Sequence, residues 1–220
     1  CITQDQQGFL WFGSRNGLNR FDGNRFKIFR HDVSDSLSIG SSSVLSLLTD
    51  KKGLMWVGTT QGVYLYNPVK ENFRLFNKIP LGEVRLIKES DGFIWLTSNN
   101  KLYRYNPDNA AIVPVEHDKG EIIAATCNPD AGLWIVNSKH AVKRYSSSLN
   151  KFIEINLQSI HENIRSNIKT VYGINDSLLI IGTTNTAYLF DLKKGKPVDL
   201  FAQVFPKKVI QINSIIHQSA

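Results

Sequence analysis

The sequence predicts an all-β fold, a β-propeller built from four-stranded antiparallel blades, and three observations indicate it. Tryptophan recurs at positions 11, 56, 95 and 134, with spacings of 45, 39 and 39 residues. Each tryptophan stands in a similar phrase, in which turn residues precede two short apolar runs separated by a second turn. No convincing amphipathic helix interrupts these phrases. Several short strands in a repeat of about 40–45 residues are typical of a propeller.

The repeat has five copies in register. Four contain the tryptophan and read DQQGFLWFGSRNGLNRFD, DKKGLMWVGTTQGVYLYN, SDGFIWLTSNNKLYRYN and DAGLWIVNSKHAVKRYS. The fifth, NDSLLIIGTTNTAYLFD, carries Ile180 in the place of the tryptophan. We therefore expect a single domain with five blades, at about residues 1–40, 41–80, 81–119, 120–163 and 164–205. Residues 206–220 would begin a further blade or supply a closing strand.

The second copy shows how each element is predicted. An apolar run at residues 44–48 is the first strand, and the turn at 50–53 ends in a glycine suited to positive φ. The strands at 54–58 and 63–66 flank a tight turn, and Asn67-Pro68 ends the third strand. The fourth strand is the Phe-x-x-Phe phrase at 73–76, which residues 26–29 repeat. Further first strands are expected at 84–87, 122–125 and 168–172.

The apolar runs are continuous, as expected for strands that are covered on both faces by neighbouring blades. We expect the tryptophans to fill the spaces between blades, as structural residues: Trp11, Trp56, Trp95 and Trp134. The aspartate of each first turn is expected to cap that turn. It has no partner carboxylate at calcium-loop spacing, so a metal role is not expected.

Residues 2–67 resemble the two-component regulator propeller repeat. The resemblance rests on Gln-Asp-x-x-Gly-Phe-x-Trp-Phe-Gly, on Gly-Leu-Asn-Arg-Phe-Asp-Gly, and on Asp-Ser-Leu-Ser ahead of Val44. The resemblance extends over nearly the whole chain. It is strongest over residues 2–67 and weakest in the fifth copy. The family is known from the periplasmic sensor region of hybrid two-component system histidine kinases of Bacteroides-type bacteria.

The resemblance implies a periplasmic sensory module that binds oligosaccharides derived from glycans, with a membrane span and a histidine kinase elsewhere in the protein. Family propellers usually have seven blades. Five copies therefore predict a truncated piece of a larger propeller, or a five-bladed ring closed by residues 209–216. An open propeller would expose an apolar blade face and strand edges, so a homodimer through that edge is expected. The alternative function is a propeller scaffold for protein–protein interaction or dimerisation without a ligand of its own.

Composition limits the other classes of function. Lys and Arg number 26 against 19 Asp and Glu, a formal net charge of +7, which raises nucleic acid as a partner. The basic residues stand singly along strands and turns, without an arginine-rich block, so nucleic acid is not expected. No apolar run approaches the roughly 20 residues of a membrane span, so no membrane contact is expected from this segment. What we still expect from the positive net charge is a mild preference for acidic ligands, such as uronate-bearing or sulfated glycans.

Catalysis is not expected of this segment. The five histidines are scattered, and two cysteines lack the spacing of a metal knuckle. No phosphate-cradling loop, zinc-protease motif or nucleophile elbow occurs, and we expect no metal and no cofactor.

Ligand binding is instead expected on the loops that join the second and third strands of each blade, since these gather on one face of a propeller with the connections between blades. Amides and cations on these loops suit sugar hydroxyls and carboxylates, although the same residues also favour tight turns. The predicted ligand-binding residues are Arg15, Asn16, Gln61, Asn99, Asn100, Lys139, His140 and Asn185.

Overall fold

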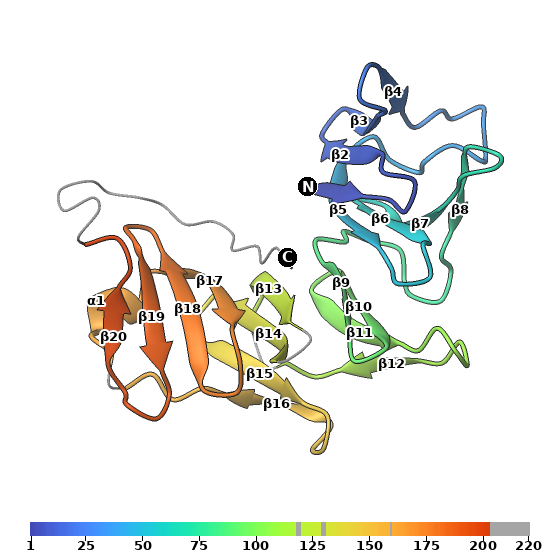
Figure 1. The fold of residues 1–220 in the computed structure, drawn as a ribbon. Helices are drawn as coiled ribbons and strands as arrows, with labels where there is room; N and C mark the ends of the chain where they lie inside the picture. Colours follow the sequence, from blue (N-terminus) through green and yellow to red (C-terminus); the bar gives the residue numbers. More distant parts are fainter. Residues whose placement is uncertain (118–119, 129–130, 159, 203–220) are drawn as a thin grey trace. The chain divides into compact units, whose positions relative to one another are not determined.

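The computed structural model describes residues 1–117, 120–128, 131–158 and 160–202 (Figure 1). Within these residues the chain forms five four-stranded antiparallel sheets and one short helix. In every sheet the strands are hydrogen-bonded in the order in which they occur along the chain, as in the blade of a propeller. The predicted all-β fold with five blades is confirmed. The strand expected at residues 209–216 lies outside the described residues.

One compact unit, Cys1–Val115, holds three blades. Blade 1 consists of β1 (Ile2–Gln4), β2 (Leu10–Ser14), β3 (Gly17–Phe21) and β4 (Phe26–Phe29). Blade 2 consists of β5 (Val44–Thr49), β6 (Met55–Thr59), β7 (Gly62–Asn67) and β8 (Asn72–Leu75). Blade 3 consists of β9 (Ile87–Ser90), β10 (Phe93–Ser98), β11 (Lys101–Tyr105) and β12 (Ile112–Val115).

The second compact unit, Glu116–Ala220, holds two blades. Blade 4 consists of β13 (Ile122–Asn128), β14 (Gly132–Asn137), β15 (Val142–Ser146) and β16 (Lys151–Glu154). The helix α1 (Glu162–Arg165) lies in the linker that follows blade 4. Blade 5 consists of β17 (Ile168–Gly173), β18 (Leu178–Thr183), β19 (Ala187–Asp191) and β20 (Pro197–Asp199).

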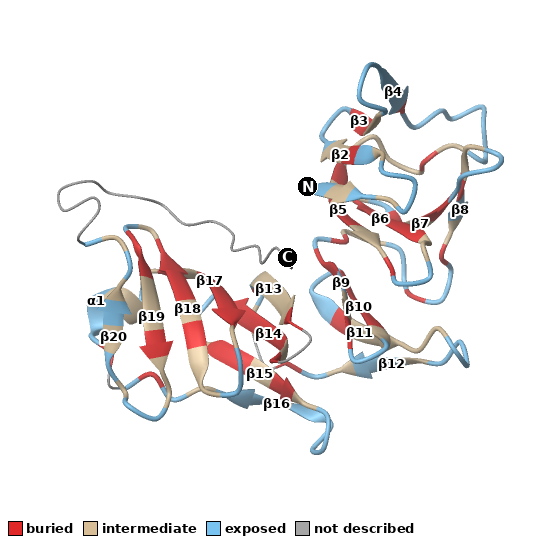
Figure 2. Ribbon diagram, viewed as in Figure 1, coloured by how far each residue is buried: buried red, intermediate tan, exposed pale blue. Residues whose placement is uncertain are grey.

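The second strand of each blade carries the repeated tryptophan at a fixed register. Trp56 pairs with Leu48 of the first strand and Leu65 of the third, and Ile180 of blade 5 pairs in the same way with Tyr172 and Leu189. The second strands of blades 2 to 5 are almost entirely buried (Figure 2). This burial explains why their sequences are continuous apolar runs rather than alternating ones.

The tryptophans are buried, and those of blades 1, 2 and 4 pack against the next blade. The Trp11 ring lies 4.8 Å from the Tyr66 ring of blade 2, and the Trp56 ring lies 5.7 Å from the Tyr105 ring of blade 3. Trp134 belongs to a core cluster that includes Ile168 and Val171 of blade 5. All four side chains, Trp95 included, are at most 1% exposed.

Arginines on the third strands stack on these tryptophans. The guanidinium of Arg20 lies 5.7 Å from the Trp11 ring centre, and those of Arg104 and Arg144 lie 5.8 and 5.6 Å from Trp95 and Trp134. Each arginine pairs with its tryptophan across the two strands. A cation over an indole face is a stabilising contact. Part of the surplus positive charge therefore serves blade packing.

In blades 1 and 2 the aspartate of the first turn is hydrogen-bonded to both the turn and the tryptophan. The Oδ1 atom of Asp50 accepts backbone N–H bonds from Lys52 and Leu54 at 3.0 and 2.8 Å. Its Oδ2 atom accepts the indole N–H of Trp56 at 2.8 Å. Asp5 makes the corresponding three bonds in blade 1, with its Oδ2 atom 2.7 Å from the indole nitrogen of Trp11. We call this arrangement the turn brace.

Glu71, which follows blade 2's third strand, ties blades 1 and 2 together. Its carboxylate forms an ion pair with Arg20 at 2.9 Å and a second with Lys27, both from blade 1. The hydrogen bond from Lys27, followed by that from Arg20, holds the pKa of Glu71 below its ordinary value of 4.5. The ionised form of this carboxylate is therefore the one that the folded state favours.

Replacing the brace carboxylate will destabilise the fold. We expect Asp50→Ala to lower the free energy of unfolding by about 2–4 kcal/mol, because it removes two turn hydrogen bonds and leaves the buried Trp56 N–H without its acceptor. Urea titration followed by tryptophan fluorescence measures this loss. Asp22→Ala is the matched control, since Asp22 accepts two backbone N–H bonds in an exposed turn without a tryptophan. An equal loss in both variants would contradict the role of the indole bond.

The Glu71 ion pairs will contribute to stability only above acidic pH. Because the folded pKa of Glu71 lies below 4.5, its contribution is complete above that pH and is lost as the pH falls through the folded value. We expect the stability difference between the wild type and Glu71→Gln to vanish in acid, measured by urea titration across pH 2–7. A difference that persists unchanged to the lowest pH would refute the ionic origin.

Candidate functional site

The turns between second and third strands lie at the same end of the blades as the linkers that join one blade to the next. Adjacent strands are antiparallel, so both kinds of connection leave from that end. Backbone hydrogen bonds join them directly: Thr60 donates to the carbonyl of Ser43 at 3.3 Å, and Ser138 donates to that of Glu121 at 2.7 Å. Corresponding bonds run from Asn99 to Glu83 and from Thr184 to Asn167. We call this end of each unit its linker face.

The residues predicted to bind ligand all lie in these turns. His140 is half-buried, and the others are exposed: Arg15, Asn16, Gln61, Asn99, Asn100, Lys139 and Asn185. Asn99, Asn100 and His140 have positive φ angles of 49°, 63° and 61°. This backbone conformation is one that asparagine tolerates better than most residues.

Two of the predicted residues use their side chains to hold the linkers. The amide of Asn99 accepts the backbone N–H of Glu83 at 3.2 Å and donates to the carbonyl of Leu81 at 3.1 Å. The Nδ1 atom of His140 lies 2.7 Å from the carbonyl oxygen of Ile168. Since a carbonyl only accepts, Nδ1 carries the proton. These two side chains therefore shape the linker face.

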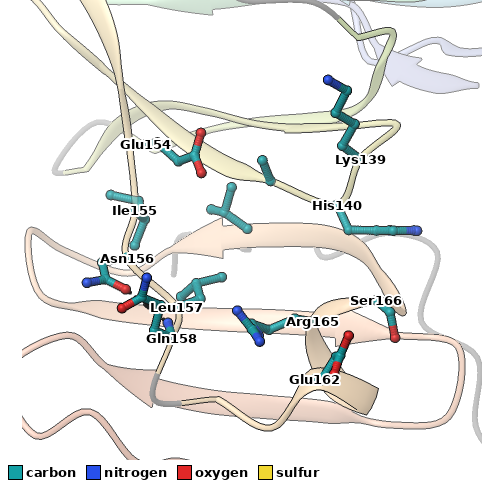
Figure 3. A pocket seen from close by; sticks show the side chains of 12 residues that line it. Lys139, His140, Glu154, Ile155, Asn156, Leu157, Gln158, Glu162, Arg165 and Ser166 are labelled. Atoms are coloured by element: carbon teal, nitrogen blue, oxygen red, sulfur yellow. Dashed lines mark hydrogen bonds between the residues drawn. The ribbon is translucent and has the colours of Figure 1, made fainter.

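A cavity of about 540 Å³ opens at the linker face of the second unit (Figure 3). We call it the linker pocket. The third strand of blade 4 and the linker to blade 5 form its walls. It is lined by Lys139, His140, Ala141, Val142, Glu154, Ile155, Asn156, Leu157, Gln158, Glu162, Arg165 and Ser166. Two of the predicted residues, Lys139 and His140, therefore border the same cavity.

The pocket combines an apolar floor with polar side chains of both charges. Val142 and Leu157 are buried, 1% and 6% exposed, in the core cluster between blades 4 and 5. The carboxylate of Glu154 lies 3.5 Å from the ammonium group of Lys143. Arg165 extends from the end of α1 into the pocket (Figure 3). Such a site can offer both hydrogen-bond donors and acceptors to a polar ligand.

A second hollow lies at the linker face of the first unit, with a volume of about 570 Å³. Gln61 is the predicted residue that lines it, together with His31, Gly40, Ser41, Ser42, Tyr64 and Leu81. Burial raises the pKa of Tyr64 above its ordinary value of 10.0. A Cβ atom at Gly40 would lie 1.7 Å from the Tyr64 hydroxyl, so only glycine lets the ring lie there.

Sequence reasoning missed most of the linker pocket. Glu154, Asn156, Gln158, Glu162 and Arg165 lie on the last strand of blade 4 or beyond it, outside the repeated phrases. One signal could have pointed to them. The step from Trp134 to Ile180 is 46 residues, which like the first step of 45 exceeds the two steps of 39, so a long linker is expected after blade 4 as after blade 1.

The described part of the chain shows no cluster of three or more His, Cys, Asp or Glu able to hold a metal ion. In the same residues no helix is long and apolar enough to cross a membrane.

Comparison with known proteins finds a family match for part of the repeat and one curated protein with a similar stretch. Residues 38–61, which run from the linker before blade 2 to its β6–β7 turn, match the family described as two component regulator propeller. Histidine kinase P4 of Formosa agariphila is 58% identical over 38 residues, which are 17% of this chain and 3% of that protein. The matched stretch is therefore a small part of this chain and a very small part of that histidine kinase.

Solved structures share the fold. The extracellular domain of a hybrid two component system of B. thetaiotaomicron matches 90% of this chain and 27% of its own, with a TM-score of 0.72 and 18% identity. A second such domain from the same organism has a TM-score of 0.62 and 18% identity, and the match covers 90% of this chain and 34% of that one. Virginiamycin B lyase from Staphylococcus aureus has a TM-score of 0.68 at 16% identity, over 90% of this chain and 68% of the lyase.

At such identities the likeness shows the fold alone, and a fold that serves both a signalling domain and a lyase does not by itself define an activity. The matched repeat is more specific than the fold. The described residues form five β-propeller blades, and residues 38–61 match the two component regulator propeller family.

Proposed function

We propose that this chain is the sensory propeller segment of a two-component signalling protein, that it lies in the periplasm, and that it binds an oligosaccharide derived from a glycan at its linker face. The observation that carries the proposal is the match of residues 38–61 to the two component regulator propeller family. The histidine kinase relative and the extracellular domains of similar fold support it. Another part of the protein would then carry out phosphotransfer. This segment would bind the oligosaccharide and would not catalyse a reaction.

The chemistry of the linker pocket suits a sugar. Its volume of about 540 Å³ is within the range of ligand sites, about 300–1,000 Å³. The amides of Asn156 and Gln158 each offer donors and an acceptor, as a ring of sugar hydroxyls requires. The Nε2 atom of His140 is left for a ligand, because Nδ1 is bonded to Ile168.

Calorimetric titration of the 220-residue chain with a panel of neutral and acidic oligosaccharides tests the proposal. We expect saturable binding of at least one sugar, and its loss in Gln158→Trp, whose indole would occupy the exposed mouth of the linker pocket. Gln7→Trp is the matched control, since Gln7 is exposed on a turn at the opposite end of blade 1. Absence of heat with every sugar would count against glycan sensing.

A second candidate function, a scaffold that dimerises through blade 1, is favoured by one observation. The register places Ile2, Phe12 and Ile28 on the face of blade 1 opposite Trp11, with Phe26 on the same face. Ile2, Phe26 and Ile28 are 67%, 60% and 49% exposed. Exposed apolar patches of this kind mark interaction surfaces.

Sedimentation of the chain at rising concentration tests this second candidate. We expect a dimer that Phe26→Asp abolishes, because a charge on the apolar face cannot be buried without a partner. Val69→Asp is the control, since Val69 is 90% exposed in the turn after β7. A monomer at every concentration would eliminate the scaffold function.

A further inference from the structure

We propose that Arg165 binds an anionic group of the ligand, the carboxylate of a uronate or a sulfate ester, inside the linker pocket. This inference rests on the proposed function and deepens it, since it names the class of sugar and the residue that selects it. Sequence reasoning gave only a mild overall preference for acidic ligands. The structure adds a specific residue, Arg165 in the linker pocket, at which an acidic group of the ligand would bind.

Arg165 is the last residue of α1, and its side chain reaches into the linker pocket (Figure 3). Its Nε atom is buried and has no hydrogen-bond partner. Within the part of the chain that the structure describes, no ion pair neutralises the guanidinium. The charge of the guanidinium is therefore not offset by an acidic side chain of the described residues, and an anion bound at the side of the guanidinium that lines the pocket would offset it.

The neighbouring acidic groups do not take the place of that anion. The Glu154 carboxylate is paired with Lys143 at 3.5 Å. Glu162 lines the same pocket, but no ion pair joins it to Arg165 among the described residues. The lining holds two cationic side chains, Lys139 and Arg165, and two anionic ones, of which Glu154 is already paired with Lys143 from outside the lining. The local balance therefore permits a further negative charge.

The geometry of a guanidinium selects the kind of anion. Its planar, forked set of N–H donors matches two oxygens of a carboxylate or a sulfate at once. A hydroxyl of a neutral sugar can accept only a single, weaker hydrogen bond from it. The amides of Asn156 and Gln158 lie on the other side of the pocket, where the hydroxyls of the same sugar would be held (Figure 3).

The first measurement uses simple anions on the whole chain and does not depend on which sugar binds. The Arg165 Nε–H signal is observed by ¹H–¹⁵N correlation spectroscopy and is assigned by its absence in Arg165→Gln. We expect it to shift saturably with sodium acetate or sodium sulfate, but not with sodium chloride at equal ionic strength. The acetate and sulfate arms distinguish a carboxylate ligand from a sulfate ester. A signal that neither anion moves overturns the inference.

The second measurement uses three disaccharides that differ at one carbon: cellobiose, its 6′-uronate and its 6′-sulfate. We expect one of the acidic forms to bind tighter than cellobiose by about tenfold or more, and Arg165→Gln to weaken that form about ten- to a hundredfold. Arg165→Lys, which keeps the charge without the fork, should fall between. Glu162→Gln should tighten binding because it removes a nearby negative charge. Arg74→Gln, at an exposed arginine of blade 2, should change nothing.

The outcomes separate this inference from the proposed function. If a neutral sugar binds and Arg165→Gln leaves its affinity and that of the acidic forms unchanged, glycan binding stands and the role of Arg165 is overturned. If acetate or sulfate moves the Arg165 signal but no oligosaccharide binds, the anion site is supported and glycan sensing fails.

Discussion

The hydrogen bond between a turn carboxylate and a tryptophan indole is the interaction on which blades 1 and 2 depend. It fixes the first turn, through backbone bonds to the same carboxylate, and it fixes the ring that packs against the next blade. One side chain therefore couples structure within a blade to the stacking of blades. In blade 4 the indole of the tryptophan has a different acceptor, since Trp134 donates to the backbone carbonyl of Ala131 at 2.8 Å.

The fold could be predicted from the sequence because its determinants repeat at fixed spacing. Turn, apolar strand and tryptophan recur together, and even Ile180 was placed correctly at the tryptophan position from its surrounding turns alone. The sequence shows that blade 4 lacks the brace carboxylate, since Asn128 stands six residues before the tryptophan where blades 1 and 2 have Asp5 and Asp50, but it does not show which group accepts the indole N–H instead. Ala131 acts through its backbone carbonyl, and a backbone group leaves no trace in residue identity.

The candidate site could be predicted only in part, for a physical reason. The turns between second and third strands belong to the repeat, so Lys139 and His140 could be named from their position. The opposite wall of the pocket comes from the linker after blade 4, which lies outside the repeated phrases and contains α1. The repeat separates Arg144, which stands inside a copy, from Arg165, which stands outside every copy, but only the structure shows that one guanidinium stacks on Trp134 and that the other side chain lines the pocket.

The turn braces and the linker face lie at opposite ends of the strands. The side chains that hold the first turns are therefore separate from the side chains that line the pocket. Substitutions of the exposed linker residues Asn156, Gln158 and Glu162 change the lining of the pocket, whereas Leu157 and Ile160 of the same linker belong to the core cluster between blades 4 and 5. Exchange of these exposed linker residues would therefore change which ligands the pocket accepts while the blades keep the same structure.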